Sequence, residues 1–315
     1  MEQKNNHMAR VHWLALPIVA LLMVLAVACQ PLQLPEGSMT SSEAPSAEST
    51  AESTEEMALG DPEAGAYVTA MVVGCGCHFN RDLGGLAGGN EFEGPWGIAY
   101  APNLTSHSTG IADVSDEELM NALRLGHASS VLSGGEGGNL AQPMPRYSSM
   151  ADEDVINLIA YLRSLDPIEN EVPVRSITGE IPDTMVQEDP PATAPTEGAD
   201  RGRYIATNAR CGRCHTPRND DGSMDWSRPL AGAPFRDTVA PNLTPDELTG
   251  LGGWSEEEIA DFLKTGFYSD GTEAHGAMKA QTDRGLGRLT DDDALAIAAF
   301  LKSLPAIENL PQASE

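Results

Sequence analysis

The chain alternates between segments with apolar residues at helical spacing and segments rich in Gly, Pro and Ser, with no sustained period-two pattern. The clearest helical faces occur near the end of each half. Their apolar positions are Val155, Leu158, Ile159 and Leu162 in one half, and Ala294, Ile297, Ala298 and Leu301 in the other. Both segments stop shortly before a proline, Pro167 or Pro305, which cannot continue a helix. The pattern predicts an all-α fold of short helices joined by irregular loops.

Two more helices are predicted from their start signals. Ser115 and Ser255 each precede three acidic residues, the last of which, Glu118 or Glu258, completes a capping box. Apolar residues at helical spacing follow, and we expect these helices to end near Gly126 and Gly266.

The two halves are also repeats of one another. Tyr67 and Tyr204 are predicted to begin matching helices. Further matching blocks are His78 with His215, Pro-Asn-Leu-Thr at 102–105 with 241–244, and Tyr-Leu-Arg-Ser-Leu at 161–165 with Phe-Leu-Lys-Ser-Leu at 300–304. The spacing between partners is nearly constant, which indicates one domain present twice. We expect tandem domains at 62–170 and 199–309, each of three to four short helices around a prosthetic group, with a proline-rich linker at 171–198.

The N-terminal region reads as a targeting segment. Residues 1–29 carry Lys4 and Arg10, then an apolar run that ends at Cys29. This is typical of a bacterial lipoprotein signal with Cys29 as the acylated residue; an uncleaved helix of about the minimum spanning length is the alternative. Residues 30–61 contain no Lys or Arg and predict a solvated acidic tether. Both interpretations place the rest of the chain outside the cytoplasm, tethered to the membrane.

Charge and composition narrow the possible partners. A formal net charge of -28 argues against nucleic-acid binding, which needs clustered Lys and Arg, and suggests a protein partner with a basic docking face. The alternative is that the acidity only maintains solubility. Aromatic residues make up 5% of the chain, so a macrocycle would help to fill small cores.

The second repeat contains a strong attachment signature. Cys211, Cys214 and His215 form a C-x-x-C-H motif, in which two thiols bond the haem vinyl groups and the imidazole ligates iron. A redox-active dithiol or half of a zinc site would not need the following histidine. The motif predicts covalently bound haem c.

A second axial ligand would close the iron to small molecules. Met278 is the candidate, because it follows Gly276 in a segment that we predict to be a loop, where a methionine has less structural reason to occur. Met224 and His275 are the alternatives.

In the first repeat, Met144 lies between two prolines that would hold it rigidly, and it is the matching candidate. Met150 is less favoured because it lies at the start of the final helix, and Met71 and Met120 are expected in the core. His107 and His127 are expected to be exposed polar residues.

The first repeat departs from the attachment signature. Its thiols, Cys75 and Cys77, are two residues apart instead of three, and Gly74 stands where the first cysteine should be. Cys77 and His78 are well placed for one thioether and proximal ligation, whereas Cys75 would need a locally altered backbone. We expect two haems; a haem-free remnant is the alternative for this repeat.

Residues 199–309, with CGRCHTPRN, APNLTPDELTG, GGWSEEEI and LTDDDALAIAAFLKSLP in order, closely resemble the cytochrome c domains of multihaem subunits of membrane-bound alcohol, aldehyde and gluconate dehydrogenases. Residues 63–170 are similar more loosely. The resemblance implies the cytochrome c fold, axial pairs of His215 with Met278 and His78 with Met144, and electron transfer from a dehydrogenase towards quinone or oxidase. The chain departs from that family in having two domains instead of three.

The resulting hypothesis is a dihaem electron relay without chemistry of its own on a substrate. Two alternatives stay open: a single-haem carrier whose first domain is a docking module, and a dihaem peroxidase-like enzyme with one five-coordinate iron.

Overall fold

The computed structural model describes residues 60–313, apart from 134, 136, 182–188 and 237. These residues belong to one compact unit, Glu56–Glu315. The predicted signal, Cys29 and nearly all of the predicted tether lie outside the described residues. Within the described ranges, no helix is long and apolar enough to span a bilayer.

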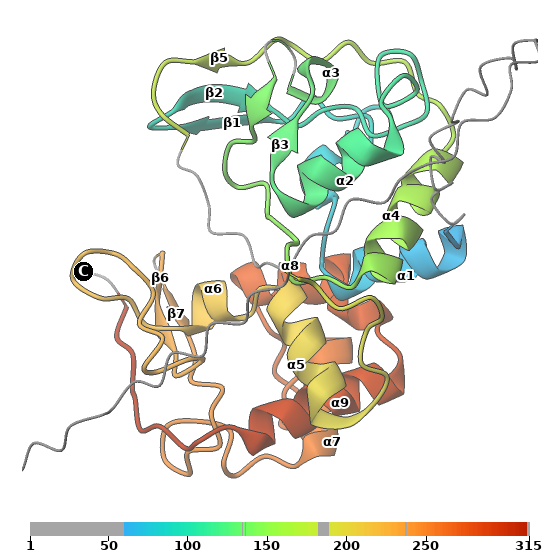
Figure 1. The fold of residues 1–315 in the computed structure, drawn as a ribbon. Coiled ribbons are helices and arrows are strands. Elements are labelled where there is room, and N and C mark those ends of the chain that lie inside the picture. Colours follow the sequence, from blue (N-terminus) through green and yellow to red (C-terminus); the bar gives the residue numbers. More distant parts are fainter. Residues whose placement is uncertain (1–59, 134, 136, 182–188, 237, 314–315) are drawn as a thin grey trace, which may run out of the picture. The chain divides into compact units, whose positions relative to one another are not determined.

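Both repeats contain, in the same order, a first helix, a short helical turn at the attachment motif, a middle helix and a last helix (Figure 1). The first repeat contains α1 (Pro62–Met71), η1 (Gly76–His78), α2 (Asp116–Arg124), α3 (Ser130–Ser133) and α4 (Asp152–Ser164). The second repeat contains α5 (Gly198–Asn208), α6 (Gly212–His215), α7 (Glu256–Thr265), α8 (Gly276–Arg284), η2 (Leu286–Arg288) and α9 (Asp291–Ser303). Tyr67 and Tyr204 lie within α1 and α5, not at their starts.

The prediction of an all-α fold is wrong, because the described residues also form three small antiparallel sheets. The strands are β1 (Glu91–Gly94) with β2 (Gly97–Tyr100) and β5 (Ser176–Ile177), β3 (His127–Ala128) with β4 (Gly138–Asn139), and β6 (Ala233–Phe235) with β7 (Thr238–Ala240). Each strand has only two to four residues, which is too short for a period-two pattern to stand out in the sequence. The fold is therefore mixed, with helices supplying the core and hairpins shaping the loops.

Both predicted capping boxes are confirmed. The Ser115 hydroxyl accepts from the Glu118 amide while the Glu118 carboxylate accepts from the Ser115 amide, and Ser255 and Glu258 repeat the arrangement. The Gly266 residue ends α7 in the left-handed conformation with φ 74°, which a glycine adopts without strain.

The first and last helices of each repeat cross at a glycine. A Cβ atom at Gly65 would lie 1.9 Å from the Asn157 carbonyl oxygen of α4, and one at Gly202 would lie 1.8 Å from the Ala296 carbonyl oxygen of α9. These backbones approach so closely that no other residue fits. The faces predicted to be buried on α4 and α9 are buried.

Two tyrosines make matching contacts between the repeats. The Tyr67 hydroxyl donates to Asp293 Oδ2 at 2.6 Å and accepts from the Thr290 amide at 3.2 Å. The Tyr204 hydroxyl donates to Asp154 Oδ2 at 2.6 Å and accepts from the Ala151 amide at 2.9 Å. Each tyrosine thus binds the first turn of the other repeat's last helix.

The segment predicted as a linker is only partly independent of the first repeat. Strand β5 pairs with β2, and the amides of Asp152 and Glu153 at the start of α4 donate to the carbonyls of Pro191 and Ala192. The Glu153 carboxylate also accepts from the Ala194 amide. These bonds satisfy donors at the helix start that have no partner within the helix.

Candidate functional site

The second attachment motif forms the short helix α6. Cys211 caps it, and the His215 amide donates to the Cys211 carbonyl at 3.1 Å, so one helical turn separates the first thiol from the imidazole. The Cys211 amide donates back to the Ala206 carbonyl of α5 at 3.1 Å. This bond joins the start of the motif to the last turn of α5.

A backbone carbonyl orients the imidazole. His215 Nδ1 lies 2.8 Å from the Pro241 carbonyl oxygen, so Nδ1 carries the proton and Nε2 keeps its lone pair for a metal. Burial lowers the pKa of His215, which favours the neutral ring that metal ligation requires.

A buried asparagine holds the loop that carries this carbonyl. The Asn242 side-chain amide donates to the Ile307 carbonyl at 2.7 Å, and its oxygen accepts from the Thr244 amide at 2.9 Å and hydroxyl at 2.8 Å. The sequence analysis identified residues 241–244 only as one of the matching blocks of the repeat. Its polar residues, Asn and Thr, within an otherwise apolar neighbourhood were the signal for a buried network.

The first repeat has the same arrangement. His78 Nδ1 lies 2.9 Å from the Pro102 carbonyl oxygen, and burial lowers the pKa of His78. Asn103 donates to the Ile168 carbonyl at 2.8 Å and accepts from Thr105, matching Asn242 bond for bond. The first histidine is therefore held for ligation as firmly as the second.

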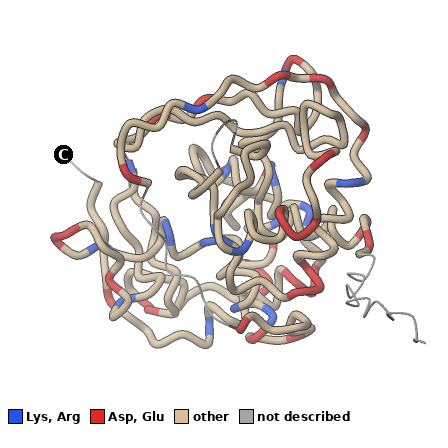
Figure 2. Tube along the Cα trace, turned by 45° about the horizontal axis from the view of Figure 1, so that its top comes forward, with Lys and Arg blue, Asp and Glu red and all other residues tan. Residues whose placement is uncertain are grey.

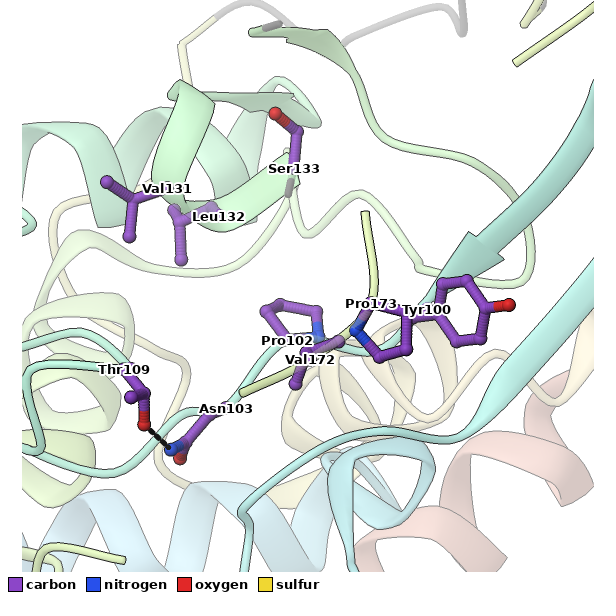
Figure 3. Close-up of a pocket in the computed structure, with 10 residues that line it drawn as sticks. Tyr100, Pro102, Asn103, Thr109, Val131, Leu132, Ser133, Val172 and Pro173 are labelled. Carbon is purple, nitrogen blue, oxygen red and sulfur yellow. Dashed lines mark hydrogen bonds between the residues drawn. The ribbon is translucent and has the colours of Figure 1, made fainter. Parts of the chain in front are cut away.

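A small pocket adjoins this loop in the first repeat. Pro102 and Asn103 face Val131 and Leu132 across it, and the Asn103 side chain bonds Thr109 at its floor (Figure 3). Its volume is about 70 Å³, room for water but far too little for a macrocycle. None of the predicted ligands lines it, so it is separate from the attachment site.

The backbone at the first attachment motif places Gly74 where the second repeat has Cys211. The Gly74 amide donates to the Thr69 carbonyl at 3.0 Å, as Cys211 does to Ala206. Cys75 then adopts the left-handed conformation with φ 61° and ψ -10°, which costs a residue with a side chain about 1 kcal/mol. This is the altered local backbone that the sequence analysis required of Cys75.

The two thiols of each motif lie in different environments, and the two motifs match in this respect. Burial raises the pKa of Cys75 to about 12 and that of Cys211 to about 11. Cys77 and Cys214 have pKa values raised by burial to a lesser extent, because arginine guanidinium groups oppose the effect. In each motif the first thiol therefore faces the apolar interior and the second lies nearer to cationic side chains.

The phenol of Tyr147 lies beside Gly74. A Cβ atom at Gly74 would be 3.2 Å from the Tyr147 hydroxyl oxygen and 2.6 Å from Val72 Cγ2. Tyr147 is 6% exposed, and burial raises its pKa, with the Cys75 thiol adding to the effect. Sequence reasoning missed this residue, because a tyrosine after the candidate methionine gives no local signal.

The candidate methionines both pack against the hydrophobic core while remaining partly exposed, which leaves their thioethers available. Met144 lies in a loop, as predicted. Met278 does not: it is the third residue of helix α8, because the chain after Gly276 forms a regular helix. Of the alternatives, His275 is exposed at the N-cap of α8 and Met224 lies in the loop that follows the second motif.

The remaining predicted residues are mostly as expected. Met71 and Met150 are core residues with 1% and 0% exposure. Met120 is half-buried against the core. His127 is exposed in β3, whereas His107 is half-buried with its Nδ1 2.9 Å from the Thr109 hydroxyl, so its predicted exposure is wrong.

The residues present fit a covalently attached haem. Each motif offers a thiol beside a histidine whose Nδ1 is already hydrogen-bonded, and each repeat has a partly buried methionine. A thiol can add across each haem vinyl group, and imidazole nitrogen and thioether sulfur are ligands of haem iron. The second repeat supplies two thiols at the usual spacing, and the first has one, Cys77, at the usual place.

Comparisons with known proteins agree with this donor set. The Cytochrome c family model matches residues 199–305. The chain is 33% identical to the fructose dehydrogenase cytochrome subunit of Gluconobacter japonicus, over 77% of this chain and 52% of that protein. It is 33% identical to the gluconate 2-dehydrogenase cytochrome c subunit of Pantoea cypripedii, over 73% of this chain and 56% of that protein.

A relative of more similar length is the "Diheme cytochrome c-type" protein of Cereibacter sphaeroides, 34% identical over 75% of this chain and 83% of that protein. The chain spans about half the length of the dehydrogenase subunits it matches. The resemblance inferred from the motifs is confirmed. The chain belongs to the cytochrome c family and is an electron-transfer protein that uses haem c.

Proposed function

We propose that this chain is a dihaem electron relay with tandem domains at 62–170 and 199–309. In the second domain Cys211 and Cys214 would bind the haem, and His215 and Met278 would ligate its iron. In the first domain Cys77, with Cys75 as a second candidate, would bind the haem, and His78 and Met144 would ligate its iron. Bound haem would supply a one-electron couple.

The observation that carries this proposal is the proximal arrangement shared by the two repeats. A histidine bonded through Nδ1 to a proline carbonyl, on a loop held by a buried asparagine, occurs at both sites. Such a network fixes the position and tautomer of a metal-ligating histidine, and its presence around His78 supports iron ligation in the first repeat as well. A haem-free docking module would need neither the free Nε2 nor the partly buried Met144.

We also propose the setting of this relay. The dehydrogenase relatives suggest a dehydrogenase as electron donor and a quinone or oxidase as the route onward. The N-terminal segment up to Cys29 would tether the chain to the outer side of the membrane. The acidic surface that follows from a net charge of -28 suits one partner with a basic docking face.

The test is the haem content of the exported protein, measured by haemochrome absorbance against protein mass. We expect two haems per chain, and about one in Cys77→Ala, because that variant loses the thiol adjacent to the first imidazole. Cys75→Ala is the matched control. It should keep both haems if Cys77 alone is enough to attach the first haem.

One observation favours the single-haem alternative: Gly74 replaces the first cysteine of the usual motif. One haem per chain, unchanged by Cys77→Ala, would restrict redox function to the second repeat.

A further inference from the structure

Both attachment motifs lie at the contact between the two repeats. A Cβ atom at Gly76, inside the first motif, would lie 3.7 Å from Arg284 Cδ at the end of α8. On the other side of the contact, the Ser149 hydroxyl lies 3.4 Å from Asn208 Oδ1 at the end of α5, three residues before the second motif. Each motif is therefore flanked by residues of the other repeat.

One arginine at this contact acts on both motifs. Arg210 directly precedes Cys211, and its guanidinium opposes the burial that raises the pKa of Cys77 in the first motif and that of Cys214 in the second. The same guanidinium opposes the rise of the Tyr147 pKa, which burial causes. Coulombic effects fall with distance, so this one side chain lies near the thiols of both motifs.

The Arg210 guanidinium has no carboxylate partner. It is half-buried, and among the residues that the structure describes it forms no ion pair. The chain has 47 Asp and Glu residues against 19 Lys and Arg, and carboxylates are spread along much of the described chain (Figure 2). Burial and the neighbouring Arg213 lower the pKa of Arg210, which shows that holding a charge here is costly. A charge kept at such a place without a partner is a candidate for a functional role.

A fixed positive charge near a haem changes its reduction potential. Reduction of the iron removes one positive charge from the site, so a nearby cation favours the reduced state and raises the potential. An arginine side chain keeps its charge at any ordinary pH. A half-buried charge is also screened by salt less than an exposed one, so its effect extends further and persists at high ionic strength.

We propose that the Arg210 guanidinium is a charge shared by the two haem sites and raises the reduction potential of both haems. This inference rests on the proposed function. It makes the potential of the first haem depend on a residue of the second repeat, so the two domains of the relay do not have independent potentials.

The corresponding position of the first repeat carries no charge. The chain leaves α1 at Val73 with φ 49°, as it leaves α5 at Arg210 with φ 62°, but the Val73 side chain is apolar. Two exposed arginines provide matched controls, because each acts on the second thiol of one motif. Arg284 acts on the first motif and Arg213 on the second.

The test is a spectroelectrochemical titration of the full-length haem protein, which measures the potentials of both haems from their absorbance. We expect Arg210→Gln to lower the equilibrium constant for reduction of each haem about tenfold, which corresponds to about 59 mV for a one-electron couple. Arg210→Lys keeps the charge and should stay within about twofold of wild type. Arg284→Gln should affect the first haem alone and Arg213→Gln the second alone, each by less than about threefold because both side chains are exposed.

The two potentials are assigned with a variant that is expected to lose the first haem. Arg210→Gln in a Cys77→Ala background leaves only the second haem to titrate, and the first potential then follows by comparison with the two-haem protein.

The outcomes separate the two proposals. A shift at the second haem alone, no shift at either haem, or equal shifts in Arg210→Gln and Arg210→Lys would overturn the shared charge and leave the relay intact. If Arg210→Gln is exported with fewer than two haems, Arg210→Asn takes its place, because asparagine tolerates the left-handed backbone at this position. Wild-type protein with a single haem overturns the relay itself, and the haem content shows this before any potential is measured.

Discussion

The two attachment motifs share a backbone course and a histidine in the same hydrogen-bonded setting but differ in their thiols. In both, the chain leaves the first helix through a residue with positive φ, Val73 or Arg210, and reaches a histidine bonded to a proline carbonyl. The second motif then places Cys211 on the turn of a helix, whereas the first has Gly74 there and a left-handed Cys75. In the proposed relay, ligation of the iron and covalent attachment of the ring are therefore separate requirements, and only the second is relaxed in the first motif.

The largest expected effect comes from restoring the usual spacing in the first motif. Gly74→Cys combined with Cys75→Gly recreates C-x-x-C-H, and the new thiol can add across the remaining vinyl group of the first haem, with sulfur and hydrogen joining its two carbons. Because a Cβ at position 74 would lie 2.6 Å from Val72 Cγ2 and 3.2 Å from the Tyr147 hydroxyl, we expect full attachment only with Val72→Ala and Tyr147→Phe added. The haemochrome α-band, which shifts to shorter wavelength as a vinyl group is saturated, measures this.

Cys75→Gly alone is the control for that experiment and should keep the spectrum of a single thioether at the first site. If wild type already shows two saturated vinyl groups at both haems and no thiol that iodoacetamide can alkylate, Cys75 is bonded in spite of its backbone, and the contrast between the motifs is wrong.

A second comparison concerns Asp293 and Asp154, the carboxylates that receive the two tyrosine hydroxyls. Burial alone would raise the pKa of Asp293, but hydrogen bonds from Arg201 and Tyr67 outweigh it and the pKa is lowered. Among the described residues no arginine forms an ion pair with Asp154, and burial keeps its pKa raised although the Tyr204 hydrogen bond and the charge of Arg201 oppose the rise. Arg201 donates to the two carboxylate oxygens of Asp293 through Nε and Nη2, each at 2.8 Å. In the first repeat, Ala64 occupies the position that corresponds to Arg201.

Asp293→Asn should therefore lower the free energy of unfolding at pH 7 by about 3 kcal/mol, because it leaves the Arg201 charge unpaired in a largely buried site. Asp293 stabilises the folded state at pH values above the ordinary carboxyl pKa. This stabilisation is lost as pH falls from there through the lowered pKa of the folded state. Asp154 has the opposite effect. Because its pKa is raised in the folded state, the free energy of unfolding falls as pH rises from the ordinary carboxyl pKa through the raised pKa. Asp154→Asn should thus cost less than about 1 kcal/mol at pH 7.

Urea unfolding at pH 4 and pH 7 distinguishes these carboxylates. We expect the difference between Asp293→Asn and wild type to shrink at pH 4. Equal losses from both substitutions at pH 7 would show that the tyrosine hydrogen bonds, and not Arg201, dominate the contacts between the repeats.

The smallest of the three effects concerns the asparagines behind the proximal loops, where the repeats should behave alike. Asn242→Ala and Asn103→Ala each remove a side chain with 2% or 1% exposure and leave the buried amide of Thr244 or Thr105 without its acceptor. We expect each to lower the unfolding free energy by about 2 kcal/mol. Each should also loosen the nearby histidine, which the potential of the corresponding haem would report. A shift confined to Asn242→Ala would mean that His78 holds no iron.

Much of the site follows from short segments. The C-x-x-C-H motif, the proximal histidines and the capping boxes at Ser115 and Ser255 each depend on residues within one helical turn, so the sequence predicts them directly. The strands were missed because their pairing depends on backbone hydrogen bonds between segments as far apart as β2 and β5. The helix that contains Met278 was missed because Gly276 at its start reads as a loop residue.

The sequence by itself determined the positions of the last helices, the capping boxes and the family, because these depend on local patterns and residue types. Only the tertiary structure decided which groups meet across long separations. It brought Tyr67 to Asp293, the Tyr147 hydroxyl to Gly74, and the Trp226 indole to Gly212 in the second motif. Such contacts join residues with no regular spacing along the chain, and packing in three dimensions fixes them.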